Sequence, residues 1–456
     1  MASPSSRGQW SGKLGFILAA AGSAIGLGNI WRFPFSAGEG GGGVFVLIYL
    51  GFVIVIGVPV MLAELSIGRH TELNPVGAFK KLVPSKVWPM VGGLGVLTGF
   101  GILAFYAVIA GWTIGYLFKA LTGGLADAVN ADASGQVFAE LVGDPLMAIL
   151  LTAIFLVLTI LVVRGGISGG IERVTTILMP LLFVLLIVLA IRSITLPNGI
   201  DGLVYLFKPD FSELSFVVVM GALGQALFSL SLGMGAMITY GSYFPKNENL
   251  WQAGVSVAMF DTLIAILAGL IIFPALFYAD IDPSAGPGLV FVVLPTIFNS
   301  MPLGSIVAIA FFFLLAIAAL TSTISLLEVV VCYFVDERKW SREKAAWTMG
   351  GLCLLLAIPS ALSQGAVDFL GANGLFAWDF LTLNNNIWGN YSLSIGAILI
   401  CIFAGWVWGV PKLLASLEEG GFPVPASGVL SFLIKVVCPV AVFIVLLFII
   451  ITGRYF

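Results

Sequence analysis

Long, unbroken runs of apolar residues, separated by short polar segments, are the dominant pattern of this chain. Crossing the hydrocarbon core of a bilayer takes roughly 20 apolar residues in a helix, and runs that stay apolar without alternating favour helices over strands. This pattern predicts eleven spans, at residues 12–35, 41–68, 87–122, 146–163, 172–192, 212–243, 250–278, 304–335, 343–362, 376–408 and 428–452. We therefore expect an all-α polytopic membrane protein with 11 transmembrane helices.

The composition supports a membrane protein and excludes several other classes. Of the 456 residues, 60% are hydrophobic and only 9% are charged, whereas about 25% are charged in an average soluble protein. A net charge of −3 without a basic block argues against nucleic-acid binding. The four cysteines lie far apart inside apolar runs, so we predict no disulfide framework or zinc site. A single histidine, His70, leaves no histidine-based metal site or catalytic triad.

Lysine and arginine predict the orientation, because they are enriched in the cytoplasmic flanks of membrane helices. Placing the N-terminus in the cytoplasm puts fifteen of the 20 Lys and Arg residues on that side. The C-terminus then lies outside, together with the loops 123–145 and 279–302. The second of these loops is partly apolar and rich in proline, so we expect it to fold over the outer mouth as a lid.

Two spans carry a Gly-x-Gly sequence near their middle, Gly26 and Gly28 in the first span and Gly233 and Gly235 in the sixth. Glycine costs about 1 kcal/mol relative to alanine inside a helix. Non-helical backbone survives at membrane depth only where it lines a cavity or is buried in protein. Close helix packing through small residues is the alternative explanation. The same interruption five spans apart favours two five-helix repeats of inverted topology, with a site between the breaks.

This repeat predicts the organisation of the chain. The expected parts are a cytoplasmic tail, two five-helix repeats and a last span, at residues 1–11, 12–192, 212–408 and 428–452 respectively. At such breaks, free carbonyls attract a cation and helix N-termini attract an anion, so a zwitterion with Na⁺ suits the site. A cation channel is less natural, because no ring of carboxylates is visible.

Five stretches carry a resemblance to a known family: Arg7 with Trp10, Gly22 to Pro34, Glu64 to Arg69, Gly224 to Tyr240, and Leu320 to Ser322. Over nearly its whole length the sequence resembles the neurotransmitter:sodium symporter family, and within it the bacterial carriers of several hydrophobic amino acids. The resemblance implies a LeuT-type fold with helices 1 and 6 unwound at mid-membrane, in the plasma membrane of a prokaryote. It also implies Na⁺-coupled amino-acid symport without enzymatic activity; a transport-inactive amino-acid sensor on the same fold is the alternative.

A second sodium site of the family corresponds to oxygens of the first and eighth spans. Ala318, Thr321 and Ser322 are spaced i, i+3 and i+4, so they share one helix face. From spacing alone, the two hydroxyls are as well explained by bonds to carbonyls of their own helix. The resemblance implies that the three residues bind Na⁺ together with the carbonyls of Gly22 and Ile25.

The first sodium site, by the same resemblance, uses the Ala24 carbonyl, the Asn29 side chain, Ser229 and Asp261. Other members usually have an asparagine where this sequence has Asp261. A carboxylate within a membrane span is costly, and is by default a functional candidate; its alternative is a protonated acid bonded to a neighbouring helix. Because an ionised Asp261 supplies the negative charge that other members take from chloride, we expect chloride independence.

The substrate is expected to bring its own carboxylate, because Gly26 stands where monoamine carriers of the family have an amine-binding Asp. By resemblance, Tyr106 and backbone amides near Gly28 donate hydrogen bonds to that carboxylate, and carbonyls near Ala24 and in the 228–231 stretch accept hydrogen bonds from the amine. Tyr106 as a packing aromatic is the alternative. No charged residue occurs among the residues expected to surround the substrate side chain, which favours a hydrophobic amino acid: Ile102, Phe228, Ser231, Met234, Thr323, Ser325 and Leu326.

Gates on each side follow from the resemblance. The inner gate would join Arg7 to Asp336, beside Trp10, Ser242 and Tyr243. The outer gate would use Arg32, opposite which Asn385 stands in place of an aspartate and leaves no ion pair.

Three further residues are expected to support the helix breaks or to allow a neighbouring helix to unwind. Glu64 in the second span is predicted to accept bonds from amides freed at the breaks. In the fifth span, Gly170 and Pro180 mark a segment that unwinds and lets water reach the second sodium site; a capped helix start with a kink is the alternative.

Overall fold

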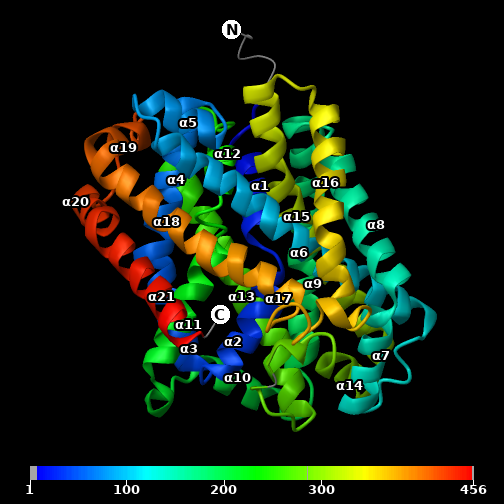
Figure 1. The fold of residues 1–456 in the computed structure, drawn as a ribbon. Helices are drawn as coiled ribbons and strands as arrows, with labels where there is room; N and C mark the ends of the chain where they lie inside the picture. Colours follow the sequence, from blue (N-terminus) through cyan, green and yellow to red (C-terminus); the bar gives the residue numbers. More distant parts are fainter. Residues whose placement is uncertain (1–7, 285, 454–456) are drawn as a thin grey trace.

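The computed structural model describes residues 8–284 and 286–453, and the regular elements of the described chain are helices joined by turns and loops, with an isolated bridge between Gly42 and Pro209 (Figure 1). Nine helices in this part of the chain are long and apolar enough to cross a membrane. They are α3–η3–α4 (Gly43–Thr71), α6 (Trp88–Thr122), α8 (Pro145–Val163), η4–α9 (Ile167–Ile194), α13 (Leu250–Tyr278), α15 (Gly304–Arg338), α16 (Arg342–Leu362), α17–η8–α18–η9 (Phe380–Val407) and α20–η10–α21 (Ser427–Thr452). The protein is therefore a multi-pass membrane protein.

The two remaining predicted spans are the broken ones. In the first, α1 (Lys13–Ala24) and the pair η2–α2 (Gly28–Glu39) are bent by 53° at the break between them. In the sixth, α11 (Phe216–Ser229) and α12 (Ala236–Gly241) are separated by non-helical residues 230–235. Helix length and hydropathy thus give nine or ten spans in the described residues, and the count of eleven depends on taking α11 and α12 as one interrupted span.

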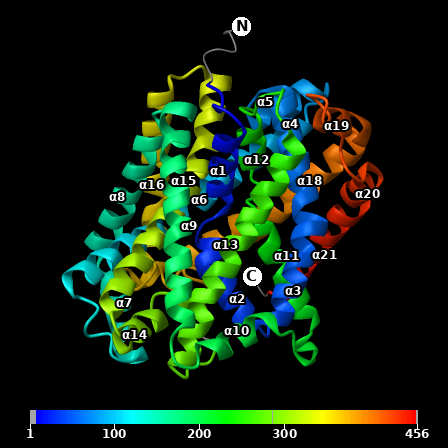
Figure 2. The ribbon, with the colours of Figure 1, turned by 180° about the vertical axis from the view of Figure 1, so that it is seen from behind.

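Shorter helices cover the two ends of the bundle. Figures 1 and 2 place α7, α10 and α14 at one end, and α5, α19 and the N-terminal side of the chain at the other. Their bounds, with those of the remaining short turns, are α5 (Pro75–Leu82), α7 (Ala131–Gly143), α10 (Gly199–Phe207), α14 (Val293–Ser300), α19 (Val410–Leu417), η5 (Phe211–Glu213), η6 (Gly286–Leu289) and η7 (Asp368–Leu370).

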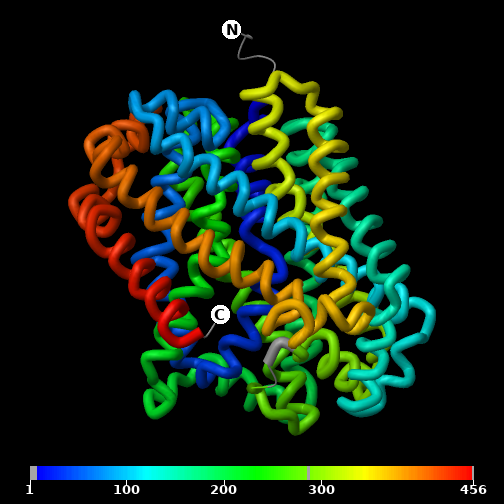
Figure 3. Tube along the Cα trace, in the orientation of Figure 1, coloured from blue at the N-terminus to red at the C-terminus, as the bar shows by residue number. Residues whose placement is uncertain are grey.

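The broken spans lie in the centre of the molecule, where the tube of the chain bends sharply (Figure 3). The first half-helix α1 packs against α9, α13 and α15, and α15 packs along α6. The glycines of the sixth span are required there. Gly233 and Gly235 have φ of +85° and +75°, a region that favours glycine. A Cβ on Gly233 would also overlap the Leu393 carbonyl oxygen of α18 (Leu393–Ile402).

Wide π-helical turns interrupt several spans. One opens the fifth span as η4 (Ile167–Glu172), directly before α9 (Arg173–Ile194), and another, η8 (Asn385–Ser392), lies in the tenth. A π turn frequently marks a functional position in a helix. The η4 turn coincides with the segment around Gly170 that the sequence singled out, while Pro180 lies inside α9.

Candidate functional site

A cluster of three polar side chains lies beside the break in the first span. Asn29 follows the break, Ser229 ends α11 and Asp261 lies within α13, and each side chain is at most 1% exposed. Asn29 Nδ2 donates to Asp261 Oδ1 at 2.8 Å and to Ser229 Oγ at 3.0 Å, and Ser229 Oγ donates to Asp261 Oδ2 at 2.8 Å. Three elements far apart in sequence thus bring several oxygen atoms together in a buried site.

A second oxygen cluster joins the same break to α15. The carbonyl of Ile25, the C-cap residue of α1, accepts a bond from Ser322 Oγ at 3.2 Å and one from Thr321 Oγ1 at 3.4 Å. Thr321 Oγ1 also donates to the Ala318 carbonyl of its own helix at 3.0 Å. Gly22 faces Thr321, since a Cβ on Gly22 would lie 3.4 Å from Thr321 Cβ. The Thr321 hydroxyl therefore bonds its own helix and also reaches the break, whereas the Ser322 hydroxyl bonds the carbonyls of Ser23 and Ile25 at the break.

A small cavity of about 20 Å³ lies between the two breaks. Tyr106 lines this cavity, and its hydroxyl accepts a hydrogen bond from the Leu27 amide at 2.8 Å. A Cβ on Gly26 would overlap the Tyr106 and Ser322 oxygens, so only glycine leaves this space. Residues from α1, η2, α6, α11, α15 and the two breaks line the cavity: Ser23, Ala24, Gly26, Gly28, Ile102, Tyr106, Phe228, Ser231, Met234, Ser322, Ser325 and Leu326.

Thr323 departs from the expected pocket, because it does not line this cavity. Its hydroxyl shares a 2.8 Å hydrogen bond with Thr159 of α8 and donates to the Leu320 carbonyl at 2.9 Å. Successive residues of an α-helix point about 100° apart, so the residue after Ser322 faces α8 instead of the break. Ser229 likewise belongs to the Asn29–Asp261 cluster, outside the cavity lining.

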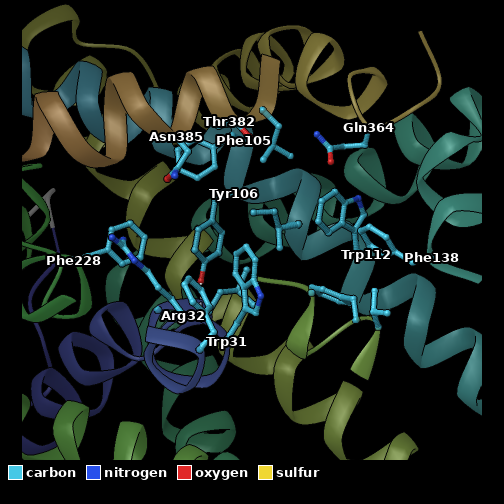
Figure 4. Close-up of a pocket in the computed structure, with 18 of the residues that line it drawn as sticks. Trp31, Arg32, Phe105, Tyr106, Trp112, Phe138, Phe228, Gln364, Thr382 and Asn385 are labelled. Carbon is cyan, nitrogen blue, oxygen red and sulfur yellow. Dashed lines mark hydrogen bonds between the residues drawn. The ribbon is translucent and has the colours of Figure 1, made fainter. Parts of the chain in front are cut away.

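A larger cavity of about 520 Å³ lies next to the small one and shares Gly28, Tyr106 and Phe228 with it. Figure 4 shows its aromatic lining, with Trp31, Phe105, Trp112 and Phe138 around the space. We call this larger cavity the vestibule. The two cavities are thus separated by Tyr106 and Phe228.

The predicted outer-gate pair lines the vestibule from opposite sides (Figure 4). The Arg32 guanidinium carbon lies 4.1 Å from the centroid of the Phe228 ring, a cation–π contact, and Arg32 is 7% exposed. Within the described residues, no carboxylate lies within 4.0 Å of Arg32, and no hydrogen bond joins it to Asn385. In place of an ion pair, the Arg32 guanidinium therefore lies over the Phe228 ring.

The opposite end of the site is closed by the N-terminal segment. Trp10 Nε1 donates to the Tyr240 carbonyl at 3.0 Å, and Trp10 N donates to the Tyr243 carbonyl at 3.3 Å. Ser242 Oγ donates to the Thr239 carbonyl at 2.7 Å. Arg7, the expected partner of Asp336, lies outside the described residues.

Glu64 lies where the sequence predicts it, beside the sixth-span break. Its Oε1 accepts the Gly233 amide at 2.7 Å, and Glu64 is fully buried. Gly170 is closely packed in the η4 turn, because a Cβ there would overlap the Val162 carbonyl of α8.

Several buried groups near the site were not singled out from the sequence. The Tyr49 hydroxyl lies 3.5 Å from Ser229 Oγ. Glu328, fully buried, forms an ion pair with Arg342 and accepts the Tyr243 hydroxyl at 2.8 Å. An acid within the apolar eighth run was the available signal for Glu328, whereas nothing in the sequence pattern distinguishes Tyr49.

Known proteins are similar to this chain over nearly its whole length. The profile of the Sodium:neurotransmitter symporter family matches residues 7–136 and 132–455. The uncharacterized sodium-dependent transporter YhdH of Bacillus subtilis (strain 168) is 38% identical over 440 residues, covering 96% of this chain and 97% of its own length. The sodium- and chloride-dependent glycine transporter 1 of Xenopus laevis is 28% identical, covering 98% and 79%.

A solved structure, that of MhsT in complex with L-phenylalanine, superposes on the chain with a TM-score of 0.88. It is 47% identical and covers 97% of this chain and 99% of its own. The expected family and the LeuT-type fold are thereby confirmed. This chain belongs to the sodium:neurotransmitter symporter family.

Proposed function

We propose that the protein is a secondary active transporter that couples the symport of hydrophobic L-amino acids to Na⁺ by alternating access. The observation that carries this proposal is the meeting of two oxygen clusters and a small cavity at the paired helix breaks. Broken helices of this kind provide carbonyls for Na⁺ and half-helix N-termini for a substrate carboxylate.

The first proposed Na⁺ site uses the Ala24 carbonyl, Asn29, Ser229 and Asp261. A hard cation prefers oxygen ligands, and this cluster offers carboxylate, hydroxyl and amide oxygens in one buried place. In the described state the Asn29 amide nitrogen faces Asp261, while Asn29 Oδ1 accepts the Gly26 amide at 3.0 Å. A half-turn of the Asn29 amide would direct its oxygen toward the cluster.

The second proposed Na⁺ site combines the carbonyls of Gly22, Ile25 and Ala318 with the hydroxyls of Thr321 and Ser322. Both hydroxyls already reach the Ile25 carbonyl. A cation between these atoms would accept all five oxygens as ligands and would tie α1 to α15. Occupation of this site would therefore hold the first half-helix in its closed position.

Chloride independence follows from the charge in the first site. Asp261 is 0% exposed, and its carboxylate accepts bonds from both Asn29 and Ser229. An ionised carboxylate in that position provides the negative charge that would otherwise need an anion beside Na⁺.

The proposed substrate is a zwitterion with an apolar side chain. Its carboxylate would lie near Tyr106 and the amides at the first break, and would complete the first Na⁺ site. Gly26 carries no side chain that could bind the amine. The carbonyls near Ala24 and Ser229 would receive that amine. MhsT, 47% identical to this chain, was crystallised with L-phenylalanine, and a phenylalanine-sized ligand suits the apolar part of the lining.

The cavity must expand to hold such a ligand, because about 20 Å³ is space for little more than a water molecule. Gly233 and Gly235 give the sixth-span break the freedom to move. Met234 between them lines the cavity and has a flexible, polarisable side chain that adapts to different shapes. Acceptance of side chains from leucine to tryptophan is consistent with this wall.

The described state fits an outward-facing carrier. The vestibule of about 520 Å³ lies on one side of the cavity, while Trp10 closes the other side. From the distribution of Lys and Arg we place the N-terminus in the cytoplasm and the C-terminus outside. From the family resemblance we infer the plasma membrane of a prokaryote. The two five-helix repeats, 12–192 and 212–408, would then move relative to each other around the cavity.

Two Na⁺ with a neutral zwitterion would carry two charges per cycle. Each charge that crosses the membrane gains about 2.3 kcal/mol per 100 mV, so at a membrane potential of about 100 mV a cycle gains roughly 4–5 kcal/mol. That energy sustains an amino-acid gradient on the order of a thousandfold.

Uptake of radiolabelled phenylalanine into proteoliposomes tests the proposal. An inward Na⁺ gradient should drive accumulation, and replacing Na⁺ by choline should abolish it. Competition by Leu, Phe and Trp, with little competition by Gly, Glu or Lys, is expected for an apolar pocket. Preference for Glu or Lys would contradict the pocket assignment. Na⁺-dependent binding without uptake would instead support a transport-inactive sensor.

A further inference from the structure

The N-terminal segment contacts both ends of the π-helical turn η4. A Cβ on Gly8 would lie 3.5 Å from Ile167 Cβ, at the beginning of η4. At its end, the Glu172 carboxylate accepts the Ser11 amide, at 3.2 Å through Oε1 and 3.0 Å through Oε2, and accepts the Ser11 hydroxyl. Figure 2 shows α9, which follows η4, beside α1.

Glu172 places a carboxylate beside the start of the first half-helix, and the Ser11 amide that donates to it directly precedes the N-cap Gly12. The N-cap position of α1, Gly12, has no side chain to bond the exposed amides, and the first turn contains no acidic residue. Helix N-termini leave unpaired amides and carry partial positive charge, so a carboxylate placed there is stabilising. No Lys or Arg among the described residues lies within 4.0 Å of Glu172, which is 6% exposed. The side-chain bonds of Glu172 in this part of the chain therefore go to Ser11.

Gly15 shows how closely the carboxylate is fitted. A Cβ on Gly15 would overlap Glu172 Oε1 and approach Cγ at 3.1 Å. Glycine at this position of α1 costs helix stability, yet it leaves the space that Glu172 occupies. Helix propensity and the Glu172 contact therefore make opposite demands on residue 15.

We propose that Glu172 couples unwinding of the fifth span to release of the first half-helix at the inner gate. Glu172 is the last residue of η4, so a rearrangement of η4 moves its carboxylate away from Ser11. The segment directly before α1 then loses the group that bonds the Ser11 amide, and α1 separates from α9. In the reverse step, the re-formed η4 turn returns the carboxylate to Ser11 and closes the gate. The inference rests on the proposed transport function, and identifies Glu172 as a positioning residue.

Hydrogen–deuterium exchange on the full-length protein in detergent tests the coupling without requiring transport. We expect Glu172→Ala to speed exchange of the amides of residues 11–16 and 167–172 about tenfold, since a bond to a charged acceptor is lost. Glu172→Gln, which keeps an acceptor oxygen, should give a smaller increase. Glu343→Gln is the control, because Glu343 is 71% exposed and its ion pair with Arg164 is long, at 3.9 Å.

Gly15→Ala separates the coupling from simple helix stability. Alanine favours the helix, so a structural effect alone would slow exchange at residues 11–16. Displacement of the Glu172 carboxylate should instead speed it, and the double variant with Glu172→Ala should exchange no faster than Glu172→Ala alone. Slower exchange in Gly15→Ala, or fully additive effects, would overturn the proposal.

Uptake by the same variants keeps this inference distinct from the proposed function. With the native chain active, we expect Glu172→Ala to lower Na⁺-driven uptake while Glu343→Gln leaves it unchanged. Native transport together with unchanged exchange in Glu172→Ala would refute the coupling and leave the transport proposal intact. Absence of uptake in the native chain would refute the transport proposal, while the exchange data would still report whether the contact holds α1.

Discussion

Neutralising Asp261 is the most direct perturbation of the first proposed Na⁺ site. Asp261→Asn keeps the size of the side chain and its capacity to bond Asn29 and Ser229, but removes the charge. At an effective dielectric constant near 20, two unit charges about 4 Å apart attract by about 4 kcal/mol. Because desolvation of a buried carboxylate opposes part of this attraction, we expect a net loss of about 1.4–2.8 kcal/mol, a 10- to 100-fold higher Na⁺ requirement.

The assay is the Na⁺ concentration for half-maximal phenylalanine uptake, measured in chloride and in gluconate media. The native protein should behave alike in both media, and Asp261→Asn should be stimulated by chloride, because an anion can replace the missing charge. Asp282→Asn is the matched control, since Asp282 is exposed and bonds the nearby Ser284 amide at 2.8 Å. A Na⁺ requirement in Asp261→Asn within about twofold of the native value, without chloride stimulation, would refute the reasoning.

Four other substitutions have defined expected outcomes. Tyr106→Phe removes the hydroxyl that accepts the Leu27 amide, and should raise the KM for phenylalanine about tenfold, measured by uptake, while kcat changes little. Ser322→Ala should raise the Na⁺ concentration for half-maximal uptake several-fold, whereas Thr323→Val, facing α8, should leave it unchanged, as titration of uptake with Na⁺ would test. Gly170→Ala should slow inward opening, seen as slower uptake at saturating substrate; unchanged transport would contradict the role of η4.

The spans and their breaks were predictable because their signals are local. A continuous apolar run reports a membrane helix by its length, and Gly26, Gly28, Gly233 and Gly235 mark the breaks because glycine is unfavourable inside a helix. The sixth span shows where the length of an apolar helix fails as a signal. Its helices α11 and α12 are each short, so they are recognised as one span only when the break between them is recognised.

Contacts between distant segments could not be read in the same way. The pairing of Ser11 with Glu172 and of Glu328 with Arg342 depends on how helices pack, and no spacing along the chain encodes it. Thr323 shows the sensitivity to rotation, since a residue one position from Ser322 faces a different helix. The family resemblance allowed the proposed oxygen ligands at the breaks to be predicted, but it did not predict the contact of Arg32 with Phe228.

The cation–π contact between Arg32 and Phe228 has a kinetic consequence. The ring of Phe228 belongs to the walls of both cavities, so a molecule passing from the vestibule inward must displace the ring and with it the guanidinium that lies over it. Encounter between a small solute and the vestibule is then fast compared with this movement. The association rate should depend little on the viscosity of the medium or on which apolar amino acid is entering. Selection among these solutes would then be expressed in how slowly each one leaves.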